Sequence, residues 1–96
     1  MKLAFEAPAM DVLVVDDEPV SRQVAAQTLE SAGYNVHRAC NGREALDILQ
    51  SGSIELVVCD WSMPEMDGLE LCRHLRGGTI DRYIYMILLT GNGRPE

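Results

Sequence analysis

The sequence predicts an α/β fold: a doubly wound parallel sheet with helices on both faces. Strand-length apolar runs alternate with helix-length segments along the chain, which is the pattern of successive β-α-β units. The linkers between them are short, as right-handed crossovers in one sheet require. Acidic residues directly follow two of the apolar runs, at the strand ends where such sheets bind their ligands.

The first strand is predicted at 10–15, because this run is apolar on both faces, like a central parallel strand. A helix is predicted from Pro19 to about Ala32. Proline is common in the first turn of a helix, and Gly33 has the position of the residue that ends one. The apolar positions of this helix form one line at Val20, Val24 and Thr28, with a second line beside it at Ala25, Leu29 and Ala32.

Residues 34–39 alternate between apolar and polar, which predicts a more exposed edge strand. Asn41 then has the position of an N-cap, and Glu44, three residues later, nearly completes a capping box. The second helix carries Ala45, Leu46 and Leu49 and ends at 51–53.

A third strand is predicted at Leu56–Asp60, followed by a loop over 61–68. A third helix has Leu71, Cys72 and Leu75 inward and stops at Gly77-Gly78. The fourth strand is predicted at Tyr83–Thr90.

Length and charge restrict the class of protein. Ninety-six residues suffice for one small domain, expected at 10–91, with a leader at 1–9 and a flexible tail at 92–96. The net charge of −7 and pI near 4.6 argue against nucleic-acid or anionic-membrane surfaces. No signal-peptide pattern or membrane-length apolar run is present, so we expect a cytoplasmic protein.

The cysteines and histidines are expected to have structural roles. Cys40, Cys59 and Cys72 lack the paired spacing of a zinc site, and we expect buried, reduced thiols rather than metal ligands or disulfides. His37 and His74 do not fall at strand ends, and we expect surface positions for both.

Asp16, Asp17 and Asp60 follow the first and third strands, so a parallel sheet would bring them to one edge. Carboxylates about 5 Å apart repel by roughly 3 kcal/mol per pair at an effective dielectric of ~20. Such a cluster requires a cation, a shared proton or wide spacing. It therefore indicates a site, although Asp16-Asp17-Glu18 could also serve only to place negative charge at a helix N-terminus.

Three segments together resemble the receiver domain of two-component response regulators. They are Val-Leu-Val-Val-Asp16-Asp17-Glu18-Pro19, the block Asp60-Trp61-Ser62-Met63-Pro64-Glu65-Met66-Asp67-Gly68, and Ile-Leu-Leu-Thr90-Gly91. The resemblance spans about residues 10–91. It implies a flavodoxin-like sheet and a domain that works with a histidine kinase or a phosphotransfer protein.

The resemblance also implies site roles. Asp60 would accept the phosphoryl group as nucleophile, and Thr90 would be the switch residue that hydrogen-bonds it. Mg²⁺ would be held by Asp17 directly, by Asp16 through water, by Asp60, and by the Ser62 backbone carbonyl. Mg²⁺ prefers such hard oxygen ligands and would neutralise the phosphoryl oxygens. Residues 61–68 could instead form only a turn, and Thr90 could be an ordinary strand-end threonine.

The chain departs from the family pattern near its end. The resemblance implies a further helix, a fifth strand ending in lysine, and a last helix, but the sequence ends at Glu96 and its only lysine is Lys2. We therefore expect the strand order 2-1-3-4 with the fourth strand at an edge. Such an edge invites pairing, which predicts a homodimer or larger assembly.

Three functions are compatible with these observations. The first is a phosphoacceptor module with no turnover of its own, and so not an enzyme. The second is a small phosphohydrolase with an aspartyl nucleophile, although its D-x-D motif is missing. The third, the main alternative, is a receiver-like dimerisation or interaction scaffold with impaired phosphorylation.

Overall fold

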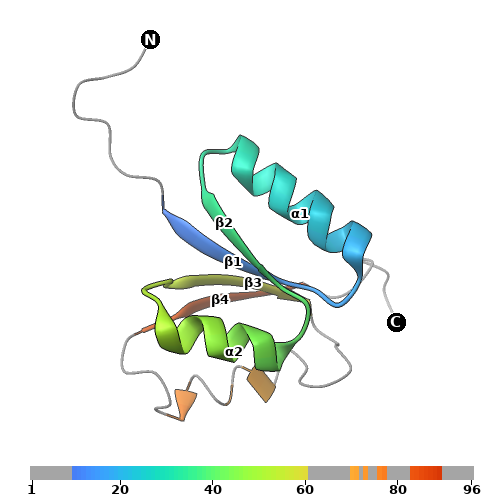
Figure 1. Ribbon diagram of the computed structural model, residues 1–96. Helices are drawn as coiled ribbons and strands as arrows, with labels where there is room; N and C mark the ends of the chain where they lie inside the picture. The colour runs from blue at the N-terminus through green and yellow to red at the C-terminus, as the bar shows by residue number, and fades with distance from the viewer. Residues whose placement is uncertain (1–9, 61–69, 72, 74–75, 78–82, 90–96) are drawn as a thin grey trace, which may run out of the picture.

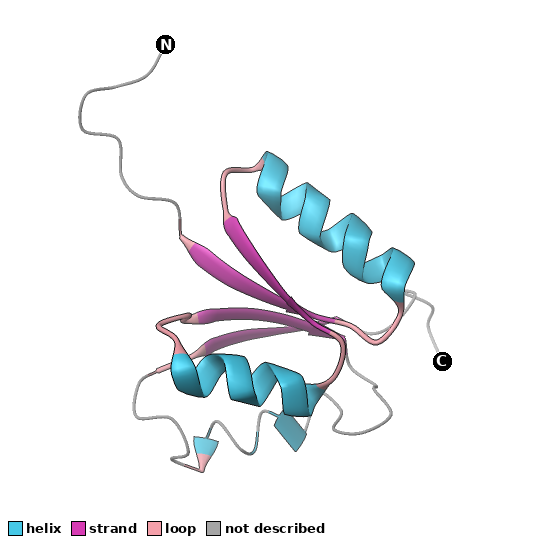
Figure 2. Ribbon diagram, in the orientation of Figure 1, coloured by secondary structure: helices cyan, strands magenta, loops and turns pink. Residues whose placement is uncertain are grey.

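The computed structural model describes residues 10–60, 70, 71, 73, 76, 77 and 83–89. Four parallel strands form one sheet in the order β2-β1-β3-β4, as predicted (Figure 1). The strands are β1 (Asp11–Val15), β2 (Asn35–Ala39), β3 (Leu56–Asp60) and β4 (Tyr85–Leu89), and the helices are α1 (Pro19–Ser31) and α2 (Gly42–Ser51). Residues 70, 71, 73 and 76 are also helical. Helices α1 and α2 lie on opposite faces of the sheet (Figure 2), so the doubly wound α/β class is confirmed.

Both ends of α1 have the predicted signals. Pro19 occupies the first turn, and the Glu18 side chain caps the helix by accepting a hydrogen bond from the Ser21 N–H at 2.8 Å. At the other end Gly33 has φ of 100°, a conformation that favours glycine. The Gly33 N–H donates to the Glu30 carbonyl and the Tyr34 N–H to the Leu29 carbonyl, which is the Schellman arrangement.

Helix α2 begins with the predicted cap. The Asn41 side chain accepts a hydrogen bond from the Glu44 N–H at 2.8 Å. The Glu44 carboxylate reaches back to accept from the Cys40 N–H, also at 2.8 Å. The backbone donor is thus one residue earlier than in a standard capping box. One N–H group that the helix leaves without a partner, that of Glu44, is satisfied in this way, together with the Cys40 N–H just before the cap.

The main core lies between the sheet and α2. Its central side chains come from the strand positions that face α2, from the residues just before β3 and β4, from α2 itself and from the third helical segment. They are Leu13, Val15, Ala39, Ala45, Leu49, Ile54, Val57, Cys59, Leu71 and Ile84. Met86 and Leu88 of β4 pack against this cluster. The inward position predicted for Leu71 is confirmed, while Cys72 and Leu75 lie outside the described residues.

The opposite face is covered by α1 over β1 and β2. Val12 and Val14 are buried there, and Ala26 is the fully buried residue of the helix. Val20 and Val24, the apolar line predicted from the sequence, are instead 67% and 57% exposed. The small Ala26 side chain allows a close approach to the sheet, and this leaves the two valines on the outer side.

The edge strand β2 is tied to β1 by polar side chains. Asp11 accepts a hydrogen bond from the Asn35 amide, and its Oδ1 atom lies 3.2 Å from the His37 Nε2 atom. The His37 side chain therefore pairs with a neighbouring strand at the surface. Cys59 is buried and Cys40 is partly exposed, and neither is joined in a disulfide within the described residues.

Candidate functional site at the carboxyl edge of the sheet

The strand register brings the first and third strand ends together. Val15 of β1 pairs with Cys59 of β3. The next residues, Asp16 and Asp60, therefore follow adjacent positions on neighbouring strands, which lie about 4.8 Å apart. The backbone thus places both aspartates at the same carboxyl edge, the location where open parallel sheets bind their ligands.

The turn from β1 to α1 is fixed by hydrogen bonds. The Asp16 N–H donates to the Ala39 carbonyl of β2 at 3.1 Å. The Glu18 N–H donates to the Asp16 Oδ1 atom at 2.9 Å. Asp16 is therefore held on both its backbone and its side chain, and is only partly exposed.

Arg22 provides a further restraint that the sequence reasoning missed. Its Nη1 atom donates to the Asp16 carbonyl at 2.8 Å from one turn into α1. The position of Arg22 in the sequence could have indicated this contact, because Arg22 lies four residues after Glu18 and on the same side of the helix as Ala26. The guanidinium brings positive charge to a turn that carries three consecutive acids.

Asp17 differs from its neighbours. Its side chain is exposed, and it forms no hydrogen bond or ion pair with other residues in the described part of the chain. By contrast, the backbone N–H of Ser21 lowers the pKa of Glu18, which keeps that carboxylate charged as a helix cap. Of the three acids in the turn, Asp17 is thus the one whose carboxylate is open to a ligand.

The remaining predicted site groups fall outside the described residues. These are Ser62, Thr90 and the side chain of Asp60. Across the ranges that are described, no three His, Cys, Asp or Glu side chains are grouped to hold a metal ion. The Asp16–Asp17 pair therefore constitutes the described part of the predicted magnesium site.

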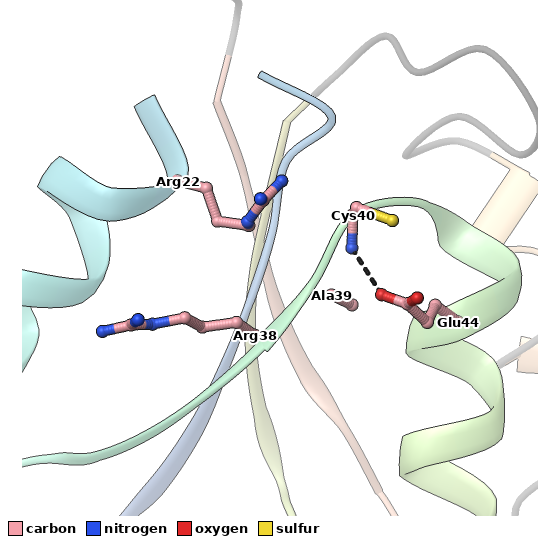
Figure 3. Close-up of a pocket in the computed structure, with 5 residues that line it drawn as sticks. All are labelled: Arg22, Arg38, Ala39, Cys40 and Glu44. Atoms are coloured by element: carbon pink, nitrogen blue, oxygen red, sulfur yellow. Dashed lines mark hydrogen bonds between the residues drawn. The ribbon is translucent and has the colours of Figure 1, made fainter. Parts of the chain in front are cut away.

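A hollow of about 330 Å³ lies beside this turn, at the carboxyl end of β2 (Figure 3). It is lined by Arg22, Arg38, Ala39, Cys40 and Glu44. Hydrogen bonding to Glu44, followed by burial, raises the pKa of the Cys40 thiol. The thiol therefore stays protonated at neutral pH, which argues against a cysteine nucleophile here.

The helices in the described ranges are all too short or too polar to cross a membrane. Taken together, an open parallel sheet with acidic residues at the carboxyl ends of two adjacent strands has the architecture of α/β domains in which ligands bind at this edge.

The chain belongs to the response regulator receiver domain family, whose model matches residues 12–96. It is 48% identical over 65 residues to the response regulator MprA of Mycolicibacterium vanbaalenii. It is also 48% identical over 67 residues to the sensor kinase CckA of Brucella abortus. Each alignment covers 68% of this chain, but only 28% of MprA and 7% of CckA.

Solved structures agree with this family. The chemotaxis protein CheY4 of Vibrio cholerae matches with a TM-score of 0.80 and 34% identity, over 91% of this chain and 72% of that one. The receiver domain of a histidine kinase from Syntrophus aciditrophicus matches with a TM-score of 0.80 and 40% identity. The match covers 91% of this chain and 66% of that one. Response regulator TrrA of Thermotoga maritima, solved in complex with Mg²⁺ and BeF, matches with a TM-score of 0.71 and 28% identity. The match covers 86% of this chain and 89% of that one.

Proposed function

We propose that this chain is a phosphoacceptor module of a two-component phosphorelay. Asp60 accepts a phosphoryl group from a histidine kinase or a phosphotransfer protein. The observation that carries the proposal is the β1–β3 register, which puts Asp60 beside the acidic turn at Asp16 and Asp17. Two acidic elements that are distant in the sequence thus share one edge of the sheet.

The chemistry is a transfer between two nucleophiles. A carboxylate oxygen of Asp60 attacks the phosphorus of the donor phosphohistidine and forms a P–O bond. The P–N bond breaks, and its electron pair goes to the imidazole nitrogen. The product is an acyl phosphate on Asp60. Because the phosphoryl group remains on the protein, we propose an acceptor without enzymatic turnover of its own.

The residues present fit a magnesium ion. Asp16 and Asp17 offer carboxylate oxygens, which are the ligands that Mg²⁺ prefers, and the Asp17 carboxylate is exposed. Asp17 would hold the ion directly and Asp16 through water, with Asp60 and the Ser62 carbonyl completing the protein ligands. When bound, the ion neutralises charge on the phosphoryl oxygens. Arg22 keeps the Asp16 backbone in place, and Thr90 is the proposed switch hydroxyl.

The acidic character of the chain supports protein partners rather than nucleic acid or membrane lipid, since its net charge is −7. Cys40 and Cys59 form no disulfide within the described residues, which fits the reducing cytoplasm, where we propose that the chain acts.

The test is transfer from a small phosphoryl donor. We expect the folded chain, incubated with Mg²⁺ and phosphoramidate, to gain the mass of one phosphoryl group, and Asp60→Asn to gain none. Beryllofluoride with Mg²⁺ should also change the fluorescence of Trp61, the only tryptophan. A folded sample that responds in neither assay, or an Asp60→Asn variant that is still modified, would refute the proposal.

An interaction scaffold is the second candidate function. It is favoured by β4, which lies at the edge of the described sheet, and by the exposed side chains of Tyr83, Tyr85 and Ile87. In this function the chain associates with a second copy, with or without phosphorylation. Mass spectrometry, which detects phosphorylation, and sedimentation, which detects association, separate the two functions. A scaffold should still associate when it carries Asp60→Asn, which cannot be phosphorylated at that position.

A further inference from the structure

The carbonyl oxygen of Asp16 lies in a turn that cannot supply its usual donor. In a tight turn, the carbonyl of the first residue accepts a hydrogen bond from the N–H three residues later. Three residues after Asp16 the chain has Pro19, which has no N–H. Glu18 is also extended, with φ of −96° and ψ of 118°, which does not fit the common hydrogen-bonded turns. The Asp16 carbonyl therefore needs a donor from elsewhere.

Arg22 supplies that donor. Its Nη1 atom donates to the Asp16 carbonyl oxygen at 2.8 Å, in a contact that is partly buried. Among the described residues, no backbone N–H donates to the same oxygen. The backbone N–H of Arg22 also donates to the Glu18 carbonyl at 3.0 Å. One residue of α1 thus holds both ends of the segment that contains Asp17.

The Arg22 guanidinium acts here as a hydrogen-bond donor rather than as one half of an ion pair. It forms no ion pair with any carboxylate that the structure describes, although the acidic turn is adjacent and Glu44 lines the same hollow (Figure 3). The pKa of Glu44 is lowered mainly by the Cys40 N–H and, to a smaller extent, by the charge of Arg22. The arginine is therefore close to several acids but donates to a backbone oxygen.

The bonded carbonyl belongs to the peptide group that joins Asp16 to Asp17. A peptide group is planar, so a restraint on its oxygen also restrains the Asp17 nitrogen and α-carbon. The Asp17 side chain is exposed and forms no hydrogen bond of its own in the described part of the chain. The direction of the Asp17 carboxylate therefore depends on the backbone, and Arg22 holds that backbone.

We propose that Arg22 is a positioning residue for divalent-cation binding by Asp16 and Asp17, because it holds the peptide group that joins them. The inference rests on the proposed function and deepens it, since it concerns the affinity of the same magnesium site. A site that is already ordered loses less conformational freedom on binding than a mobile one, and so binds more tightly. Arg22 acts on the ion only through the backbone of the two aspartates.

The sign of the effect separates positioning from electrostatics. The guanidinium is positive, so its charge alone opposes the binding of another cation nearby. If this charge were the whole effect of Arg22, its removal would strengthen Mg²⁺ binding. If Arg22 holds the turn, its removal weakens Mg²⁺ binding although a repelling charge is lost. The two roles thus predict changes in opposite directions.

Arg38 is a matched control, because it lines the same hollow and also links β2 to α1 (Figure 3). Its guanidinium lies 3.3 Å from the Glu30 carboxylate and 3.5 Å from the Gln23 amide oxygen, both in α1. Within the described ranges it makes no hydrogen bond to the acidic turn. Arg38→Met therefore removes the same charge and a link between helix and sheet, but it leaves the Asp16 carbonyl bonded.

Titration calorimetry with Mg²⁺ at constant ionic strength compares the parent chain with Arg22→Met and Arg38→Met. Methionine keeps a long apolar side chain but removes the charge and the donor. We expect Arg22→Met to bind Mg²⁺ about tenfold more weakly, as for the loss of one hydrogen bond from a charged donor. Arg38→Met should bind at least as tightly as the parent. Equal or tighter binding by Arg22→Met, or an equal loss in both variants, would overturn the proposal.

Amide exchange measured by NMR without metal tests the restraint itself. The Glu18 N–H, which donates to the Asp16 Oδ1 atom at 2.9 Å, should exchange faster in Arg22→Met than in the parent. The Glu44 N–H, which donates to the Asn41 side chain at 2.8 Å, should exchange as before. An unchanged rate at Glu18 would also contradict the positioning role. Should circular dichroism show that Arg22→Met does not fold, the shorter and uncharged Arg22→Gln replaces it in both measurements.

The parent chain and Asp17→Asn separate this result from the proposed function. If the parent gains a phosphoryl group and Arg22→Met binds Mg²⁺ as tightly as the parent does, the positioning role is wrong and the phosphoacceptor function stands. Asp17→Asn removes a proposed ligand and should abolish most of the Mg²⁺ binding. If the parent binds no Mg²⁺, or if Asp17→Asn binds it unchanged, the proposed magnesium site is wrong and the positioning role is overturned with it.

Discussion

Three carboxylates in this domain are held in their charged form by hydrogen-bond donors of nearby residues. The pKa of Glu44 is lowered chiefly by the Cys40 N–H, that of Glu18 by the Ser21 N–H, and that of Asp11 by His37. A lowered pKa in the folded state means that the folded chain binds these protons less readily than the unfolded chain does. Their contribution to stability is therefore present above the ordinary pKa and is lost as pH falls through the folded value.

Glu44→Gln tests this linkage. Glutamine keeps the hydrogen bond to the Cys40 N–H but removes the titrating group. The free energy of unfolding of the variant should therefore fall less than that of the parent between about pH 6 and about pH 3. Urea unfolding across this range is the measurement, with the exposed Glu55→Gln as control. Equal pH slopes for Glu44→Gln and the parent would contradict the assignment.

Local signals predicted the residues at the helix ends well. Pro19, Gly33, Asn41 and Glu44 all have the predicted roles, because caps depend on neighbours within a few positions. The hydrogen bond from Arg22 to the Asp16 carbonyl was not predicted. The spacing places Arg22 on the same side of α1 as Ala26, but the hydrogen bond also depends on how α1 lies against the end of β1, which no local pattern specifies.

At the scale of elements, periodicity located α1 but did not orient it. Val20 and Val24 recur at helical spacing, and so do Arg22, Ala26 and Leu29, so both sides of the helix show a regular pattern. The sheet is contacted by the side with the small Ala26, because close packing favours it over the valines. The pattern alone could not reveal this choice.

Gly33 ends α1 in a conformation that other residues adopt only at a cost. A Cβ atom at this position would meet no atom within 4 Å, so a substitution here acts through the backbone alone. Gly33→Ala should lower the free energy of unfolding by about 1 kcal/mol. Gly33→Asn should lose less, because asparagine tolerates positive φ. Urea titration measures both, and an unchanged midpoint for Gly33→Ala would contradict the argument.

For the whole molecule, more of the fold than of the site could be predicted from the sequence. The alternation of strands and helices predicted a parallel sheet and the convergence of Asp16 and Asp60, and the resemblance to the receiver family implied the strand order. The site roles remain predictions, since Ser62, Thr90 and the Asp60 side chain lie outside the described residues.

The main core is small, so single truncations should matter. Leu49 of α2 is fully buried in it. Leu49→Ala should lower the free energy of unfolding by about 2–5 kcal/mol, a large share of the 5–15 kcal/mol typical of domains. Thermal unfolding followed by circular dichroism checks this, with the exposed Gln50→Ala as control. A loss below about 1 kcal/mol for Leu49→Ala would indicate that this cluster does not hold the domain together.

The central position of β1 has a consequence for the turn that follows it. β1 has a strand on each side, and Val12 to Val15 are buried on both faces of the sheet. Local opening of a domain begins at frayed ends and exposed edges, and the segment enclosed on all sides opens last. Asp16 and Asp17 therefore follow one of the two interior strands of the described sheet, so we expect fraying at the sheet edges to disturb their arrangement little.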